Sequence, residues 1–80
     1  MITFLDGILE EKIPGRVVIN VNGVGYEVAV PLSSLDQMPA QGETARILIY
    51  HHITEVSQAL FGFATKDERT MFTQLLSVSG

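Results

Sequence analysis

Most of the chain alternates between apolar and polar positions with a period of two, which is typical of β-strands. Segments of this kind are separated by turn residues or by short polar stretches. They cover residues 2–9, 16–21, 24–30, 45–54 and 58–63. The first segment carries apolar residues at both parities, which favours a strand in a closed or covered sheet. The pattern therefore predicts five strands between residues 2 and 63.

Turn signals fall between the predicted strands. Glu10 to Lys12 is a polar stretch that we expect to end the first strand, and Pro14-Gly15 marks the turn after it. Asn22-Gly23 is a strong hairpin signal, because a type I′ turn needs a positive φ at both central residues. Gly25 lies inside the third strand, where a glycine predicts a bulge or the close approach of another backbone.

Two segments have helical patterns instead. Residues 33–38 predict a single helical turn with Ser33 as its N-cap, which Pro39 prevents from growing. Thr65 and Glu68 form a capping box ahead of a helix expected from about Asp67 to Ser77. The apolar stripe of this helix is wider than a terminal surface helix needs, which indicates the opening of a longer structure. The stripe consists of Met71, Phe72, Leu75 and Leu76.

The order of these elements predicts an all-β fold: a five-stranded OB-fold Greek-key barrel with a short helical turn between strands 3 and 4 and a C-terminal α-helix. An SH3-like barrel fits less well, because it lacks an insertion between the third and fourth strands. We expect residues 1–63 to form the barrel domain and residues 64–80 to begin a second, truncated domain.

Composition adds limits on function. The chain has 80 residues, of which 46% are hydrophobic, and a formal charge of −4. An acidic barrel argues against simple nucleic-acid binding, which needs a basic face. The chain has no cysteine, so it offers neither a disulfide nor a thiolate metal site. Neither a signal peptide nor an apolar run of about 20 residues is present, so we expect a cytoplasmic protein without a membrane span.

Residues that could carry catalysis or bind a metal are few. His51 and His52 are adjacent on a predicted strand, so they point to opposite faces and cannot share one metal ion. The serines occupy cap or turn positions, where capping is commoner than nucleophilic catalysis. We therefore predict no catalytic residue, no metal and no cofactor. Phe61 and Phe63 allow two interpretations, exposed rings that stack on bases or part of the core.

Several short segments, distributed along the whole chain, together resemble one known family. They are Met1-Ile2, Gly7-Ile8, Glu11-Lys12, Gly23 to Val28, Pro31, Leu60 to Phe63, Glu68 to Phe72 and Leu75 to Gly80. In this order they are similar to the N-terminal part of the RuvA family of bacterial Holliday junction recognition proteins. The last segment resembles the approach to the first helix-hairpin-helix motif of that family.

The resemblance implies a non-catalytic subunit of an ATP-dependent branch-migration complex in recombination, DNA repair and the SOS response. It implies an N-terminal OB-fold, helix-hairpin-helix motifs that grip DNA backbones, and four subunits that form a plate on a four-way junction. The implied partners are junction DNA, further copies of the chain, the hexameric RuvB ATPase and the RuvC resolvase. A bacterial cytoplasmic location follows from the same resemblance.

The resemblance also assigns a role to the loop between the last two strands. From the residues alone, Glu55 is most simply a solvent-facing turn residue. In the RuvA family this loop is an acidic pin at the junction centre, usually with two adjacent acidic residues. Here the pin carries Glu55, and Val56 takes the second place as an apolar wedge. The alternatives are a generic OB-fold module that binds single-stranded nucleic acid or a protein, and a small enzyme.

Overall fold

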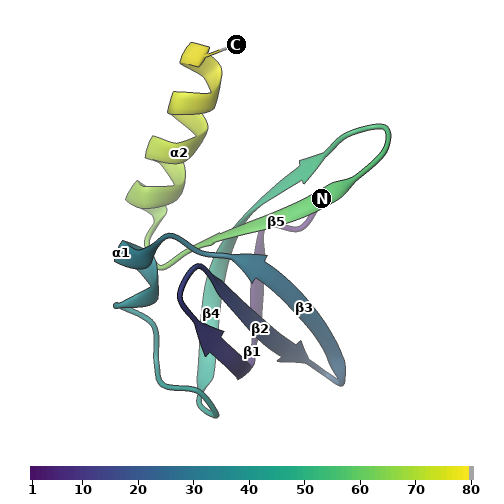
Figure 1. The fold of residues 1–80 in the computed structure, drawn as a ribbon, viewed down its shortest axis with the longest axis vertical. Helices are drawn as coiled ribbons and strands as arrows, with labels where there is room; N and C mark the ends of the chain where they lie inside the picture. Colours follow the sequence, from purple (N-terminus) through teal and green to yellow (C-terminus); the bar gives the residue numbers. More distant parts are fainter. Residues whose placement is uncertain (80) are drawn as a thin grey trace.

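A computed structural model describes residues 1–79 of the chain and shows a barrel with two helices (Figure 1). Its elements are β1 (Phe4–Ile13), β2 (Arg16–Val21), β3 (Val24–Ala29), α1 (Leu32–Leu35), β4 (Thr44–Ile53), β5 (Gln58–Phe63) and α2 (Lys66–Ser79). The strands pair in the order β1-β2-β3-β5-β4, and β4 pairs with β1 to close the barrel. The predicted OB-fold, with a helix inserted between the third and fourth strands, is confirmed.

Strand β1 closes the barrel because it pairs with two neighbours. Its first half, from Phe4, lies along β4, and its second half, up to Ile13, lies along β2. The register shifts between Leu9 and Glu11, which is the position of a β-bulge. The prediction that the polar stretch at Glu10 ends this strand was therefore wrong. After the bulge the backbone still pairs with β2, since side-chain polarity does not prevent ladder hydrogen bonds at a barrel rim.

The hairpin between β2 and β3 follows the predicted geometry. Asn22 has a φ of 53° and Gly23 a φ of 90°, as a type I′ turn requires. The Gly23 amide donates to Oδ1 of Asn20 at 2.8 Å, which fixes the turn from one side. Both alternatives predicted for Gly25 were wrong. The β2–β3 register runs without interruption from the pair Arg16–Ala29 to the pair Val21–Val24, and a Cβ added at Gly25 would meet only a side-chain atom, Cγ1 of Val18, at 3.6 Å.

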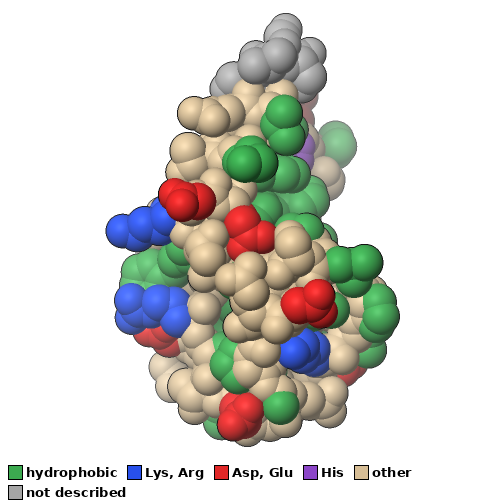
Figure 2. Space-filling view, turned by 90° about the vertical axis from the view of Figure 1, so that its left-hand side faces the viewer, with side chains coloured by type: hydrophobic (Ala, Val, Ile, Leu, Met, Phe, Trp, Pro, Cys, Tyr) green, Lys and Arg blue, Asp and Glu red, His purple; other side chains and the backbone are tan. Residues whose placement is uncertain are grey.

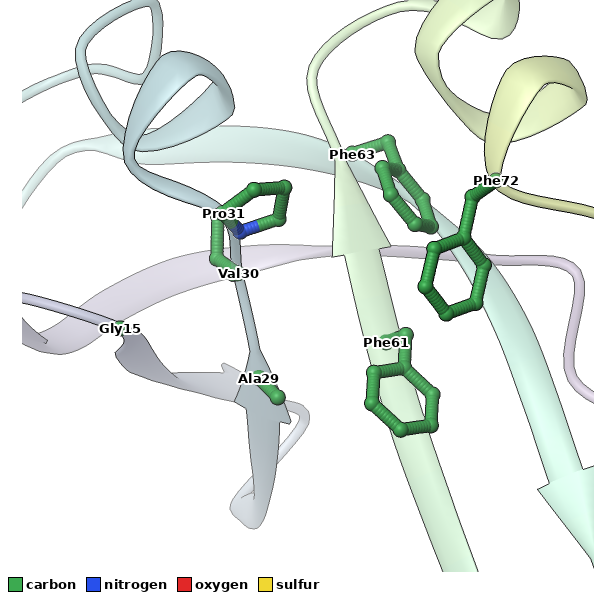
Figure 3. A pocket seen from close by; sticks show the side chains of 7 residues that line it. All are labelled: Gly15, Ala29, Val30, Pro31, Phe61, Phe63 and Phe72. Carbon is green, nitrogen blue, oxygen red and sulfur yellow. The ribbon is translucent and has the colours of Figure 1, made fainter. Parts of the chain in front are cut away.

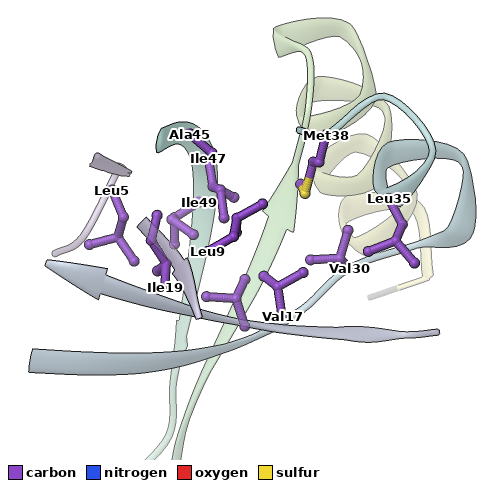
Figure 4. Packing of buried hydrophobic residues seen from close by; sticks show 11 residues of the cluster. Leu5, Leu9, Val17, Ile19, Val30, Leu35, Met38, Ala45, Ile47 and Ile49 are labelled. Carbon is purple, nitrogen blue, oxygen red and sulfur yellow. The ribbon is translucent and has the colours of Figure 1, made fainter. Parts of the chain in front are cut away.

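The barrel interior is filled by aliphatic side chains from β1, β2, β3, β4 and the β3–β4 connection (Figure 4). The buried cluster consists of Leu5, Leu9, Val17, Ile19, Val28, Val30, Leu35, Met38, Ala45, Ile47 and Ile49. In β3, Val28 is fully buried and Tyr26 packs against the cluster, whereas Glu27 between them is exposed. The alternation that predicted this strand is therefore confirmed for Tyr26, Glu27 and Val28.

Helix α1 begins differently from the prediction. Pro31 is its N-cap residue, and no side chain caps the helix. The assignment of Ser33 as N-cap was wrong: Ser33 lies inside the helix, and its hydroxyl donates to Oε2 of Glu68 at 2.9 Å. Proline suits this place, because its fixed φ and missing N–H cost little at a helix start.

Helix α2 begins at the predicted capping box. Oγ1 of Thr65 accepts the Glu68 amide at 3.2 Å, so Thr65 caps the helix as expected. The helix runs over Lys66–Ser79, slightly longer than predicted, and Gly80 lies outside the described residues. No helix in the described part of the chain is both long and apolar enough to cross a bilayer.

Two elements extend away from the barrel. The inner parts of β4 and β5 pair with β1 and β3, but from His51 to Leu60 these two strands pair only with each other. The β4–β5 hairpin and helix α2 therefore leave the barrel as separate arms that diverge from its upper end (Figure 1).

Candidate functional site

The tip of the β4–β5 hairpin, residues 54–57, is an ordered turn although it is fully exposed. The Thr54 amide donates to the Ser57 carbonyl at 2.8 Å, and the Ser57 amide donates to Oγ1 of Thr54 at 3.0 Å. The same Oγ1 lies 3.0 Å from the Ser57 hydroxyl. A hydroxyl can donate one hydrogen bond and accept two, so the Thr54 side chain can make several of the hydrogen bonds that close the turn. These bonds fix the positions of Glu55 and Val56 between Thr54 and Ser57.

Glu55 and Val56 occupy the outermost positions of this turn. Glu55 is exposed, and Val56 is 94% exposed. Arg46, the one Lys or Arg in β4, is bound to Asp6, with distances of 2.6 Å and 2.7 Å to the two carboxylate oxygens. A shallow polar hollow of about 430 Å³ lies beside the turn and is lined by residues 54–58. The tip thus presents one carboxylate and one apolar side chain to solvent.

The two histidines lie at the base of this hairpin and face different neighbours. Nδ1 of His51 accepts the Ile2 amide at 3.1 Å, and its Nε2 lies 2.9 Å from Oε1 of Gln58. The His52 ring lies instead beside Tyr50 and Phe61, with centroids 6.1 Å and 6.5 Å away. The predicted opposite orientation is confirmed. Among the described residues no group of three or more His, Asp or Glu side chains is placed to hold a metal ion.

Phe61 and Phe63 belong to a cluster outside the barrel. Phe72 of α2 contacts both rings, at centroid distances of 5.3 Å and 5.2 Å (Figure 3). It also contacts Tyr50, at a centroid distance of 5.7 Å. The side of β5 that faces the barrel interior carries Gly62 instead, where an added Cβ would lie 2.6 Å from Cγ1 of Val28. Phe63 is buried, so the core interpretation is confirmed for this residue, whereas Phe61 is half-buried and its ring packs against Phe72 of α2.

An apolar hollow of about 280 Å³ lies beside this cluster, where β5 meets the end of β3 (Figure 3). A second one, of about 190 Å³, continues along α2 past Pro31 and Phe63 to Met71 and Leu75. Met71 and Leu75 are each 63% exposed. Hydrophobic side chains gather on this side of the molecule over α2 (Figure 2). The apolar stripe of α2 is therefore only half used by the barrel.

A polar contact joins α2 to α1. The Glu68 carboxylate accepts hydrogen bonds from the hydroxyls of Ser33, at 2.9 Å, and Thr65, at 3.3 Å. Burial by itself raises the pKa of Glu68, but hydrogen bonds from Ser33, Ser34 and Thr65 outweigh it, so the pKa lies below its ordinary value. Ser34 is fully buried, and its Oγ accepts the Ala64 amide at 3.2 Å. These contacts fix the start of α2 against the β3–β4 connection.

The lowered pKa of Glu68 predicts how stability changes with pH. Such a group stabilises the fold above its ordinary pKa of about 4.5, and this contribution is lost as the pH falls through the lower folded value. Between pH 7 and pH 3, the melting temperature should fall less steeply with decreasing pH for Glu68→Gln than for the parent protein. Ser33→Ala, which removes one donor, should give an intermediate slope. Equal slopes for Glu68→Gln and the parent would contradict this assignment.

Most basic side chains of the chain are already engaged. Arg16 bridges Glu11 and Glu27, both at 2.9 Å, and Arg46 binds Asp6. Nζ of Lys12 donates to backbone carbonyls at 3.1 Å and 3.2 Å. Arg69 donates to the Thr3 carbonyl at 2.9 Å. A single-strand binder needs a groove of available positive charge, so this arrangement disfavours the alternative of an OB-fold module that binds single-stranded nucleic acid.

Comparison with known proteins gives consistent matches. A family model described as the RuvA N terminal domain matches residues 1–62. Curated proteins named "Holliday junction branch migration complex subunit RuvA" are similar over all 80 residues. Identity is 49% to the protein of Dechloromonas aromatica, 46% to that of Chromobacterium violaceum and 44% to that of Solibacter usitatus. The chain spans only 41–42% of the length of these relatives.

Proposed function

The chain belongs to the RuvA family, and from this we propose that it is the N-terminal domain of a subunit that binds Holliday junctions during branch migration. The observation that carries the proposal is the exposed β4–β5 tip with Glu55 and Val56, in a chain matched to this family along its whole length. In this role the domain performs no catalysis. It works in the bacterial cytoplasm with junction DNA, further copies of itself, the RuvB ATPase and the RuvC resolvase.

Glu55 is the acidic pin in this proposal. In a tetramer, four such carboxylates converge near the centre of the junction, where phosphates of the four arms also come close. Two unit charges 4 Å apart interact by about 1 kcal/mol in water, so each carboxylate steers DNA rather than dominating binding. The repulsion is screened beyond about 10 Å at 0.1 M salt. Glu55 therefore disfavours a continuous duplex across the plate more than a junction whose centre is open.

Val56 has a different part in the same tip. A nearly fully exposed valine on an ordered turn presents a compact apolar surface with little side-chain entropy to lose. We assign it the role of a wedge against bases that unpair at the crossover. Val56 stands where the family resemblance implies a second acidic residue, so the tip of this chain has an uncharged contact at that position.

Helix α2 opens the next domain in this proposal. Residues 1–63 form the barrel domain, and residues 64–80 begin the helix-hairpin-helix domain. The support is the apolar stripe of α2, of which Phe72 is covered while Met71 and Leu75 stay exposed. An exposed stripe of this width is expected where further helices pack. The DNA backbone contacts then lie mainly in that domain, which agrees with the engaged basic side chains of the barrel.

The pin assignment predicts a change in DNA preference. In the full-length protein, Glu55→Gln should strengthen binding to linear duplex by up to about fivefold, because loss of about 1 kcal/mol of repulsion corresponds to that factor. Junction affinity should change less. Both affinities can be measured by fluorescence anisotropy at about 0.1 M salt.

Matched variants separate charge from folding. Val56→Asp adds a carboxylate at the neighbouring position and should shift the preference towards junctions. Glu43→Gln removes an exposed carboxylate at the opposite end of β4 and should leave the preference unchanged. If Glu55→Gln alters neither the junction-to-duplex ratio nor the branch-migration rate, Glu55 is only a turn residue.

A further inference from the structure

The first three residues of the chain lie along the base of the β4–β5 hairpin. They continue the β1–β4 ladder beyond Phe4, because the Ile49 amide donates to the Thr3 carbonyl at 2.8 Å. The Ile2 side chain packs against the barrel core. This N-terminal segment, residues 1–3, is therefore seated by a backbone hydrogen bond and by apolar contact.

His51 ties the N-terminal segment to both strands of the hairpin. One ring nitrogen accepts the Ile2 amide, so this nitrogen carries no proton. The other ring nitrogen then carries the proton and can donate to Gln58, the first residue of β5. A single imidazole thus links the N-terminal segment, β4 and β5 at the point where the hairpin leaves the barrel.

Arg69 ties the same segment to α2. Its Nη1 donates at 2.9 Å to the Thr3 carbonyl, which also accepts the Ile49 amide. A carbonyl oxygen has two lone pairs, so it can hold both donors at once. The guanidinium comes from the first turns of α2, four residues after the cap at Thr65. One backbone carbonyl therefore connects the helix to the strand that leads to the tip.

We propose that His51 and Arg69 are positioning residues that act through the N-terminal segment to fix the angle between the β4–β5 hairpin and α2. This inference rests on the proposed function, in which the hairpin reaches the junction centre and α2 leads to the domain that grips DNA. Phe72 packs α2 against the lower hairpin, and Glu68 joins it to α1. Packed rings alone would let α2 slide along the hairpin. Hydrogen bonds are directional, so the two that meet at the Thr3 carbonyl fix the orientation of α2 relative to β4.

The absence of cysteine from the chain allows a direct measurement. Cysteines introduced at Val56 and Gln74, both exposed, carry spin labels on the tip and on α2 of the 80-residue chain. Pulsed electron paramagnetic resonance then gives the distribution of distances between the labels. We expect His51→Ala and Arg69→Ala each to broaden this distribution roughly twofold, because each frees one arm from the segment.

The controls distinguish positioning from general loosening of the fold. Arg46→Ala removes an exposed ion pair with Asp6 on the barrel and should leave the distribution as in the parent. Arg69→Lys retains a donor for the Thr3 carbonyl and should restore most of the parental width. Thermal unfolding of each variant confirms that the labelled chain is folded, and Arg69→Gln replaces Arg69→Ala if the latter does not fold.

The results decide the inference independently of DNA. Broadening in both alanine variants with recovery in Arg69→Lys supports it. Parental widths in His51→Ala and Arg69→Ala overturn it, as does equal broadening in Arg46→Ala. Failure of the proposed function would show instead in the Glu55→Gln binding ratios, which this measurement does not involve.

Discussion

Gly7→Ala should cost the protein about 3 kcal/mol of unfolding free energy or more. A Cβ at this position would lie 2.2 Å from the Asn20 carbonyl oxygen and 2.9 Å from the Asn20 carbonyl carbon. These atoms belong to the β2 backbone, so they can move only if β1 and β2 separate near the pair Ile8–Asn20. Overpacking typically costs 1–3 kcal/mol, and a backbone clash lies at the upper end of that range or above it.

The expected cost of Gly7→Ala is large relative to the total free energy of unfolding. A domain of 80 residues has roughly 4–12 kcal/mol of stability in total, so Gly7→Ala should remove about a quarter to three quarters of it. Urea unfolding followed by circular dichroism measures the change. Gly25→Ala is the matched control, because its Cβ would make only an ordinary contact, 3.6 Å from Cγ1 of Val18. A Gly7→Ala midpoint within error of the Gly25→Ala midpoint would show that β1 and β2 do not approach this closely.

Ile47→Ala should lower the unfolding free energy by about 2–5 kcal/mol, the range for large-to-small changes in a core. Ile47 is fully buried at the centre of the barrel, and its Cγ2 lies 2.7 Å from where a Cβ of Gly62 would be. The backbone of β5 thus comes close to this side chain and cannot easily collapse into the space left behind. A melting temperature lower by about 4–8 °C for each kcal/mol is expected.

Ile53→Ala makes the same chemical change on the same strand. Ile53 is 51% exposed, because β4 has left the barrel at this point. Its loss should cost about 0.5 kcal/mol, as for most surface substitutions. Calorimetry of the two variants compares them directly. Similar melting temperatures for Ile47→Ala and Ile53→Ala would contradict the boundary between the barrel and the projecting hairpin.

The candidate site could be predicted only in part from the sequence. The polar residues between two alternating segments placed Glu55 and Val56 in a turn, because a hairpin of this length must expose its connection. Their assignment to a pin depends on the family resemblance and remains a prediction. The hydrogen bonds that order the turn were missed, although Thr54 and Ser57 are residue types that often make them.

Local signals determined the elements of the fold. Alternation defined the strands, Asn22-Gly23 defined a hairpin, and Thr65 with Glu68 defined the start of α2. These features depend on backbone dihedral preferences and on neighbours within four residues, so a sequence contains them directly. The order of strands around a short helix was then enough to indicate a closed OB-fold barrel.

Contacts between distant residues were decided only by the tertiary structure. The bulge after Leu9 follows from the need of β1 to pair with two strands, and the cover over Phe61 comes from Phe72 on another element. Ser33 was misassigned as a cap because its partner, Glu68, lies 35 residues further along the chain. The Thr3 carbonyl accepts hydrogen bonds from Ile49 of β4 and from Arg69 of α2, and Arg69 lies 66 residues further along the chain than Thr3. Periodicity carries no information on such pairs, because they depend on how the closed barrel brings its ends together.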